Sequence, residues 1–169
     1  KNKNVLYLTQ AAMIAALYVV LTMIANALGI ASGNIQVRFS EALTVLPFLT
    51  PAAVPGLFIG CLIANLVTGA MLPDIIFGSL ATLIGAIGTW MLGKAALGKD
   101  EKQKKLFTWL SPLLANAVII PPVLKYAYGI LPMWFSVITV TAGEIISCGI
   151  FGLILLAALK KYKNQLFPV

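Results

Sequence analysis

Long apolar runs, separated by prolines, glycines and short charged clusters, make up most of this chain. A helix needs about 20 consecutive apolar residues to cross the hydrocarbon core of a bilayer. The runs predict membrane-spanning helices at 5–28, 40–50, 54–70, 73–95, 106–128 and 134–159. The segment at 54–70 is shorter than a full crossing, so a tilted or partial helix buried inside the protein is the alternative there. We therefore predict an all-α integral membrane protein with six transmembrane helices in one bundle over residues 1–169.

The basic residues indicate how these helices are oriented. Ten of the 12 Lys and Arg residues lie in three clusters, at 1–3, 94–105 and 160–163, which flank the apolar runs. Such clusters stay on the cytoplasmic side of a membrane, so an even number of spans should separate each pair of clusters. Prolines between 47 and 73 divide the first interval into short pieces, which favours four spans there rather than two. We expect a plasma-membrane protein with cytoplasmic termini, a solvated cytoplasmic loop at 98–105, and outer loops at 31–39, 70–73 and 129–133.

The composition excludes several classes of function. A chain with 60% hydrophobic and 10% charged residues is too apolar for a soluble fold of this size. The net charge of +7 lies in the flanking clusters rather than on an aromatic and basic face, so we expect no nucleic-acid partner. Histidine is absent, which argues against a zinc enzyme or a Ser-His-Asp hydrolase, and we expect no metal or cofactor. The segment 88–94 resembles the start of a P-loop, but Ala95 stands where Ser or Thr must bind Mg²⁺, so any ATP binding belongs to another polypeptide.

Ionisable residues away from the basic clusters are the candidate functional residues. A charge inside a membrane span costs several kcal/mol unless it is paired or hydrated. In the predicted topology the charges within the helices gather in the outer half of the membrane, which indicates a polar pocket that opens outward. They are Arg38, Glu41, Asp74, Lys125 and Glu144.

Some of these residues also have structural explanations. Asp74 follows Pro73 at a helix start, where a negative charge is favourable. Glu41 has Arg38 as a helical neighbour, and Lys125 can extend to the membrane surface. Glu144 has no such explanation and is the strongest candidate. Further candidates for the pocket are the amides of Asn65 and Asn116 and the aromatic side chains of Phe39, Tyr128 and Trp134.

Small residues predict close helix packing in two places. Ala11-x-x-x-Ala15 and Ala12-x-x-x-Ala16 form adjacent ridges on the first helix, and Gly56-x-x-x-Gly60 forms another on the third. Such spacing allows backbones to approach closely in membranes. The contact lies either within the bundle or with another subunit.

Three segments together resemble the QueT family of queuosine-precursor transporters. They are Gln36–Pro47 (QVRFSEALTVLP), Pro55–Asn65 (PGLFIGCLIAN) and Asp74–Leu83 (DIIFGSLATL), and the resemblance covers nearly the whole chain. It implies the substrate-binding S component of an energy-coupling factor (ECF) transporter, with six helices and no enzyme activity. It further implies docking onto a module of one transmembrane coupling protein and two cytosolic ATPases through Ala11, Ala12, Ala15 and Ala16.

The ligand implied by the resemblance is the pre-queuosine base, 7-aminomethyl-7-deazaguanine. A carboxylate can accept the two adjacent N–H groups of its guanine-like edge, and its ammonium suits a second carboxylate. We expect Glu144 in one of these roles and Glu41 or Asp74 in the other. Asn116 or Asn65 would bind the carbonyl edge, and an aromatic residue would stack on the ring.

Three alternatives remain from the sequence. The closest is an S component for another vitamin or purine-like nutrient. A structural membrane subunit predicts no saturable ligand and leaves the charges in the outer half unexplained. An intramembrane enzyme using Glu41 and Asp74 as an acid pair would lack any nucleophile and base pair.

Overall fold

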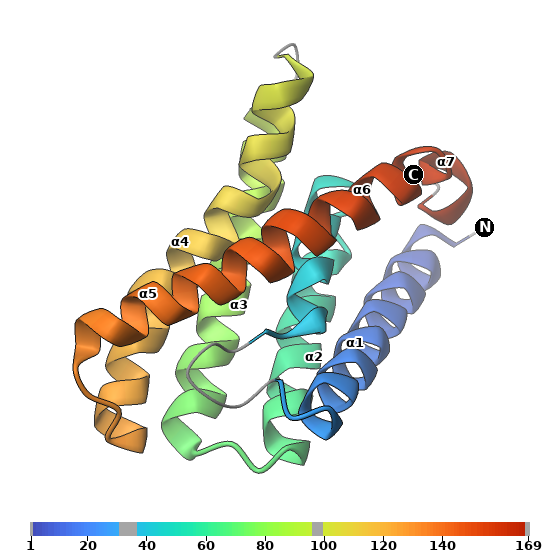
Figure 1. Ribbon diagram of the computed structural model, residues 1–169. Coiled ribbons are helices and arrows are strands. Elements are labelled where there is room, and N and C mark those ends of the chain that lie inside the picture. The colour runs from blue at the N-terminus through green and yellow to red at the C-terminus, as the bar shows by residue number, and fades with distance from the viewer. Residues whose placement is uncertain (1, 31–36, 96–99, 168–169) are drawn as a thin grey trace.

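The chain forms helices joined by short connections. Its computed structural model describes residues 2–30, 37–95 and 100–167, and these parts contain no strand (Figure 1). In chain order the elements are α1 (Lys3–Ala27), the 3₁₀ helix η1 (Phe39–Phe48), α2 (Ala53–Val67), α3 (Leu72–Ala95), α4 (Glu101–Tyr128), α5 (Met133–Glu144), the π-helix η2 (Ile145–Phe151), α6 (Gly152–Lys160) and α7 (Lys163–Leu166).

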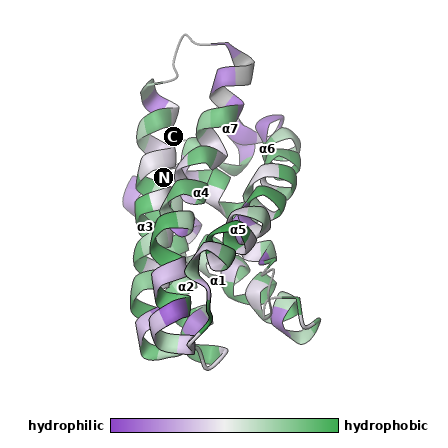
Figure 2. Ribbon diagram, turned by 60° about the vertical axis from the view of Figure 1, so that its left-hand side comes forward, coloured by the Kyte–Doolittle hydropathy of each residue, from purple (hydrophilic) through white to green (hydrophobic). Residues whose placement is uncertain are grey.

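Four helical stretches are long and apolar enough to cross a membrane. They are α1, α3, the Lys105–Tyr128 part of α4, and the continuous stretch Met133–Lys160 formed by α5, η2 and α6. Hydrophobic residues cover most of their length (Figure 2). They coincide with the long apolar helices predicted at 5–28, 73–95, 106–128 and 134–159, and they support a membrane protein. That each of them crosses the membrane stays a prediction.

The predicted spans at 40–50 and 54–70 correspond to short helices. η1 has 10 residues and α2 has 15. Both are shorter than the about 20 residues of a perpendicular crossing. Six helical segments therefore occur where six were expected, and four of them have the length of a full span.

One predicted loop is wrong in part. The stretch 98–105 was expected to be a loop, but α4 begins at Glu101. Lys, Glu and Gln are good helix formers, so a polar run beside an apolar helix extends it by about a turn rather than leaving it. Residues 96–99 of this loop, and residues 31–36 of the predicted outer loop, lie outside the described parts of the chain.

The small residues of α1 pack against the glycines of α2. A Cβ atom added at Gly56 would lie 2.7 Å from the carbonyl oxygen of Ala11, and one at Gly60 would lie 3.0 Å from that of Ala15. The two helices thus touch through their backbones. Ala11 and Ala15 are buried by this contact, so the predicted docking surface is reduced to Ala12 and Ala16, which remain exposed.

η1 lies at the centre of the molecule. All residues from Ser40 to Pro47 are buried, and Leu43, Val45 and Leu46 belong to the hydrophobic core. The segment, cyan in Figure 1, packs against α1, α2, α3, α4 and α6. The backbone hydrogen bonds of a 3₁₀ helix have poorer geometry than those of an α-helix. Irregular backbone is unfavourable in contact with lipid, and the surrounding helices keep η1 away from it.

The two chain ends lie side by side. The side-chain amide of Gln10 donates to the carbonyl oxygen of Leu166 (3.4 Å), and Lys3 and Phe167 line one groove. In Figure 1 the end of α3 and the start of α4 point toward the same side as these ends. The end of α3 and the start of α4, which border the basic cluster at 94–105, therefore point toward the same side as the basic segment 160–163. That this side is cytoplasmic stays a prediction.

The contact between α1 and α2 makes a testable prediction. We expect Gly60→Ala to lower the midpoint of thermal unfolding in detergent, because its methyl group would lie 2.8 Å from the Tyr18 Cβ atom. Overpacking of this kind costs about 1–3 kcal/mol. Gly149→Ala is the matched control, because its nearest neighbour would be Ile145 Cγ2 at 3.9 Å. Equal midpoints for the two variants would contradict the backbone contact.

Candidate functional site

A small polar cavity lies between η1, α3, α4 and α5. Its volume is about 30 Å³, which is room for one or two water molecules. It brings together four predicted site residues from three distant segments of the chain. The lining residues are Arg38, Glu41, Gly78, Thr82, Asn116, Ile120, Val140 and Glu144.

Glu41 is held at the cavity by α1. Its side chain is 4% exposed, and the Tyr18 hydroxyl donates a hydrogen bond to Oε1. The other oxygen, Oε2, is buried and has no hydrogen-bond partner among the described residues. A buried carboxylate oxygen without a donor is unfavourable, so Oε2 is a ready acceptor for a ligand.

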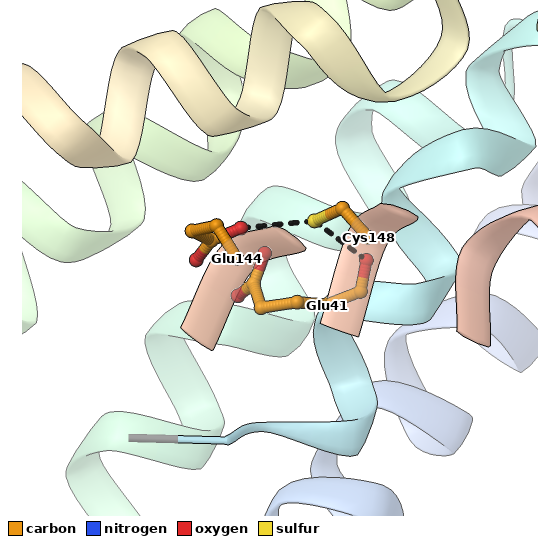
Figure 3. Close-up of side chains that lie close together, drawn as sticks. All are labelled: Glu41, Glu144 and Cys148. Atoms are coloured by element: carbon orange, nitrogen blue, oxygen red, sulfur yellow. Dashed lines mark hydrogen bonds between the residues drawn. The ribbon is translucent and has the colours of Figure 1, made fainter. Parts of the chain in front are cut away.

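Glu144 ends α5 and faces Glu41. Asn116 Nδ2 donates to its Oε1 (3.0 Å), and Cys148 Sγ donates to its Oε2 (2.9 Å). Figure 3 shows the Glu41 and Glu144 side chains turned toward each other beside Cys148. One carboxylate oxygen from each acid and the sulfur all lie within 4.8 Å of one another. Both Glu144 oxygens therefore have a protein donor, whereas only one Glu41 oxygen does.

The π-helix η2 begins directly after Glu144. Cys148 lies in it, four residues later, and it also contacts the backbone oxygen of Glu41 (3.4 Å) and the Thr44 hydroxyl (3.3 Å). π-helical segments in α-helices occur often at functional sites. Here the segment carries the thiol that connects the sixth predicted span to η1.

Asp74 lies beside the cavity and is linked to it by Arg38. Arg38 Nη2 is 3.9 Å from Asp74 Oδ2, and the Tyr128 hydroxyl donates to the same oxygen (3.1 Å). This is a long ion pair at the limit of direct contact. Asp74, Glu41 and Glu144 are three acids around one guanidinium, so the site has a formal excess of negative charge.

Gly78 forms part of the cavity wall at a tightly packed point, where a side chain would crowd its neighbours. The position that a Cβ atom would take there is 3.2 Å from Asp74 Oδ1 and 3.3 Å from Asn65 Nδ2. An acceptor and a donor thus face the same point of bare backbone. Asn65 is 2% exposed and its amide also contacts Cys61 Sγ (3.5 Å). Asp74 and Asn65 are consequently close to the cavity, although neither lines it.

Three predicted site residues lie elsewhere. Lys125 Nζ lies 5.3 Å from the ring centre of Tyr126, and Trp134 is 63% exposed with its ring against Phe135. Phe39 packs edge-on against Phe151. None of the three lines the described cavity, and no aromatic residue does. Stacking of a ligand on an aromatic side chain therefore stays a prediction.

Sequence reasoning missed Tyr18 and Cys148 as site residues. A signal existed for each. Tyr18 follows Ala11 and Ala15 on the same face of α1, and Cys148 follows Glu144 by one helical turn. Their role depends on which helix faces contact each other in the folded protein, and the sequence pattern alone does not determine this.

Glu41, Glu144 and Cys148 are also the described residues at this place that could ligate a metal. Zinc needs four ligands at about 2.0–2.3 Å in a structural site. Three donors, one of them a thiol that already donates to Glu144, make an incomplete set. The expectation of no metal stays a prediction.

Comparison with known proteins identifies the family. The model of the QueT transporter family matches residues 8–161. This chain belongs to the QueT transporter family. It resembles a curated protein of Lactococcus lactis subsp. cremoris (strain MG1363), the queuosine precursor transporter QueT, at 40% identity over 73 residues. Those residues are 43% of this chain and 43% of that relative. No solved structure matches the chain.

The family membership settles the class of protein. It confirms the resemblance seen in the sequence, and both the family and the relative are transporters rather than enzymes. This finding argues against the alternative of an intramembrane enzyme that uses Glu41 and Asp74 as an acid pair.

The contact between Tyr18 and Glu41 can be tested by unfolding. We expect Tyr18→Phe to lower the midpoint of thermal unfolding, because it removes the one donor of a buried carboxylate. A hydrogen bond to a charged group contributes about 1.5–3 kcal/mol. In a Glu41→Gln background the same change should have a smaller effect, which a double-mutant cycle measures. Tyr126→Phe, at an 80% exposed position, is the control. Additive effects of the two changes would rule out the contact.

Proposed function

We propose that this protein is the substrate-binding S component of an ECF-type ABC importer and binds the pre-queuosine base, 7-aminomethyl-7-deazaguanine, from the extracellular side. The observation that carries the proposal is the pair of buried carboxylates, Glu41 and Glu144, within a membrane bundle. The family match and the name of the Lactococcus relative support the class of substrate.

The carboxylate pair suits the ammonium of this base. Charge-assisted N–H···O bonds are about 2.7–2.9 Å long. Glu41 and Glu144 oxygens lie within 4.8 Å of one another, so a single nitrogen between them reaches both. The free Oε2 of Glu41 favours this acid as the main acceptor, with Glu144 as the second. This choice narrows the sequence-based expectation, which placed Glu144 first.

The guanine-like edge would then bind near Gly78. It presents adjacent N–H donors and a carbonyl acceptor, and Asp74 Oδ1 and Asn65 Nδ2 face the same point there. Asp74 accepts and Asn65 donates in this arrangement. Asn116 is engaged by Glu144, which leaves Asn65 as the better partner for the carbonyl oxygen.

Binding of a fused bicyclic base requires the site to open. Pockets for small molecules have volumes of about 300–1,000 Å³, whereas this cavity has about 30 Å³. Arg38 is the side chain best able to move. It precedes η1, is 23% exposed and is joined to Asp74 by a long contact. Its departure would free the Asp74 carboxylate for the base.

Transport would depend on a partner module. We propose that six helical segments place both termini in the cytoplasm and that the chain lies in the plasma membrane. The shared side of the basic clusters and the contact between the chain ends support this orientation. A transmembrane coupling protein and two cytosolic ATPases would supply the energy, and the exposed Ala12 and Ala16 on α1 are the small residues left for that contact.

A different nutrient that carries an amine is the alternative. The excess of acids at the site favours cationic ligands in general and does not by itself select a deazaguanine. A vitamin with an amine would share the carboxylate pair but not the contacts near Gly78. A structural subunit would bind none of these compounds.

Binding measurements with two analogues test the proposal. We expect Glu41→Gln to weaken binding of 7-aminomethyl-7-deazaguanine by about 10- to 100-fold, the range for a lost hydrogen bond to a charged group. Binding of the neutral 7-cyano analogue should change much less, because it offers no ammonium. Glu144→Gln should behave in the same way with a smaller loss. Isothermal titration calorimetry of the purified protein measures both ligands.

Asp100→Asn is the matched control. Asp100 is an exposed acid that precedes α4, 16 residues before Asn116, the first cavity residue of that helix. Equal losses for the amine and the nitrile would contradict the role given to the carboxylates. No saturable binding of either base by the unchanged protein would remove the proposed ligand.

A further inference from the structure

A second concavity, larger than the polar cavity, faces the outside of the bundle between α3 and α4. Its volume is about 310 Å³. We call it the α3–α4 groove. Its lining is almost entirely apolar, and it shares no residue with the polar cavity. The lining residues are Pro73, Phe77, Ile119, Pro122, Val123, Tyr126 and Ala127.

The packing of α3 and α4 explains why a groove exists at this end. Farther along, the helices touch through their backbones, because a Cβ atom added at Gly85 would lie 2.7 Å from Pro112 Cα. Val123 is 11 residues beyond Pro112, or about 16 Å along a helix. At the level of Val123 the facing residues are Phe77 and Pro122. These side chains are larger than Gly85, so the two helices are farther apart here and leave a space between them.

The rim of the groove carries a positive charge that the proposed function does not use. Lys125 Nζ lies over the Tyr126 ring, and Tyr126 lines the groove and is 80% exposed. Among the described residues, no carboxylate pairs with Lys125. Lys125 is also in the last turn of α4, which ends at Tyr128 and is capped by Gly129. A lysine and a tyrosine at the end of a spanning helix belong at the level of lipid headgroups.

We propose that the α3–α4 groove binds an acyl chain of an anionic phospholipid, whose phosphate contacts Lys125. An apolar groove that continues into an unpaired ammonium is complementary to a lipid with a hydrocarbon chain and a negative headgroup. A neutral helix of another protein would leave Lys125 without an anion. The Lys125 side chain, expected from the sequence to bind the transported solute, is thus assigned to a lipid.

Native mass spectrometry of the detergent-purified chain tests the site. The probes are phosphatidylglycerol and phosphatidylcholine with identical acyl chains. The unchanged protein should retain phosphatidylglycerol in preference to phosphatidylcholine. Lys125→Gln should reduce that preference by about fivefold, the effect expected of one cation beside an anionic headgroup. Lys125→Arg should restore it.

Lys94→Gln is the matched control. Lys94 Nζ also lies over an aromatic ring, 3.8 Å from the ring centre of Trp90, but Lys94 is at the end of α3 farthest from the groove. It should leave the preference unchanged. Ala127→Phe fills the groove and should reduce retention of both lipids. Midpoints of thermal unfolding near that of the unchanged protein establish that the variants fold.

Three results would overturn the proposal: equal retention of the two lipids by the unchanged protein, equal loss in Lys125→Gln and Lys94→Gln, or unaltered retention in Ala127→Phe. If a helix of another protein occupied the groove, lipid retention would be unaltered in Ala127→Phe, and the mass spectrum would show a complex with that protein. None of the readouts uses the transported solute, so the result is independent of the proposed function.

Discussion

The central constraint on this structure is the burial of carboxylates inside a membrane bundle. Glu41 and Glu144 are almost fully enclosed, in a molecule that exposes many large hydrophobic side chains. Isolated charges in such surroundings cost several kcal/mol unless donors or opposite charges accompany them. The protein supplies Tyr18, Asn116 and Cys148 as donors but leaves one Glu41 oxygen free. A site with one unmet acceptor is suited to a ligand that brings its own donor.

The rest of the fold serves to bring these groups together. The close contact of α1 with α2 carries Tyr18 toward η1, and η1 carries Glu41 and Arg38 to the cavity. The stretch of α5 and η2 delivers Glu144 and Cys148 from the other side. A short irregular helix in the middle of the bundle is tolerable because longer helices separate it from lipid. The site and the hydrophobic core therefore share η1.

Much of this arrangement follows from the sequence, for identifiable reasons. The four long helices were predictable because length and apolar character suffice to define a span. Glu41 and Glu144 were identifiable because charges are rare inside spans. The 3₁₀ form of η1 was not predictable, since a 10-residue apolar segment with a proline is compatible with several helical forms.

Spatial partners were harder to predict than elements. Which acid keeps a free oxygen depends on Tyr18 and Asn116, which lie on other helices. In the sequence, Lys125 and Arg38 are both basic residues within predicted spans or at their ends. In the structure, Lys125 lies over an aromatic ring, whereas Arg38 lines the cavity. Ala11 and Ala12 are adjacent in the chain but face the inside and the outside of the bundle. Such differences depend on how each helix is rotated about its own axis. The 3.6-residue period identifies which residues share a face, but it does not say which neighbour that face contacts.

The backbone contact between α1 and α2 has a mechanical consequence. Because Gly56 and Gly60 leave no space between the two helices, α1 and α2 form one closely packed unit that includes Tyr18. Glu41 is tethered to that unit by its hydrogen bond. α3 also packs against α2, where the Thr82 hydroxyl donates to Cys61 Sγ (3.4 Å). Glu41 is therefore anchored to α1 and α2, on the side of the cavity opposite Asn116 of α4 and Glu144 of α5.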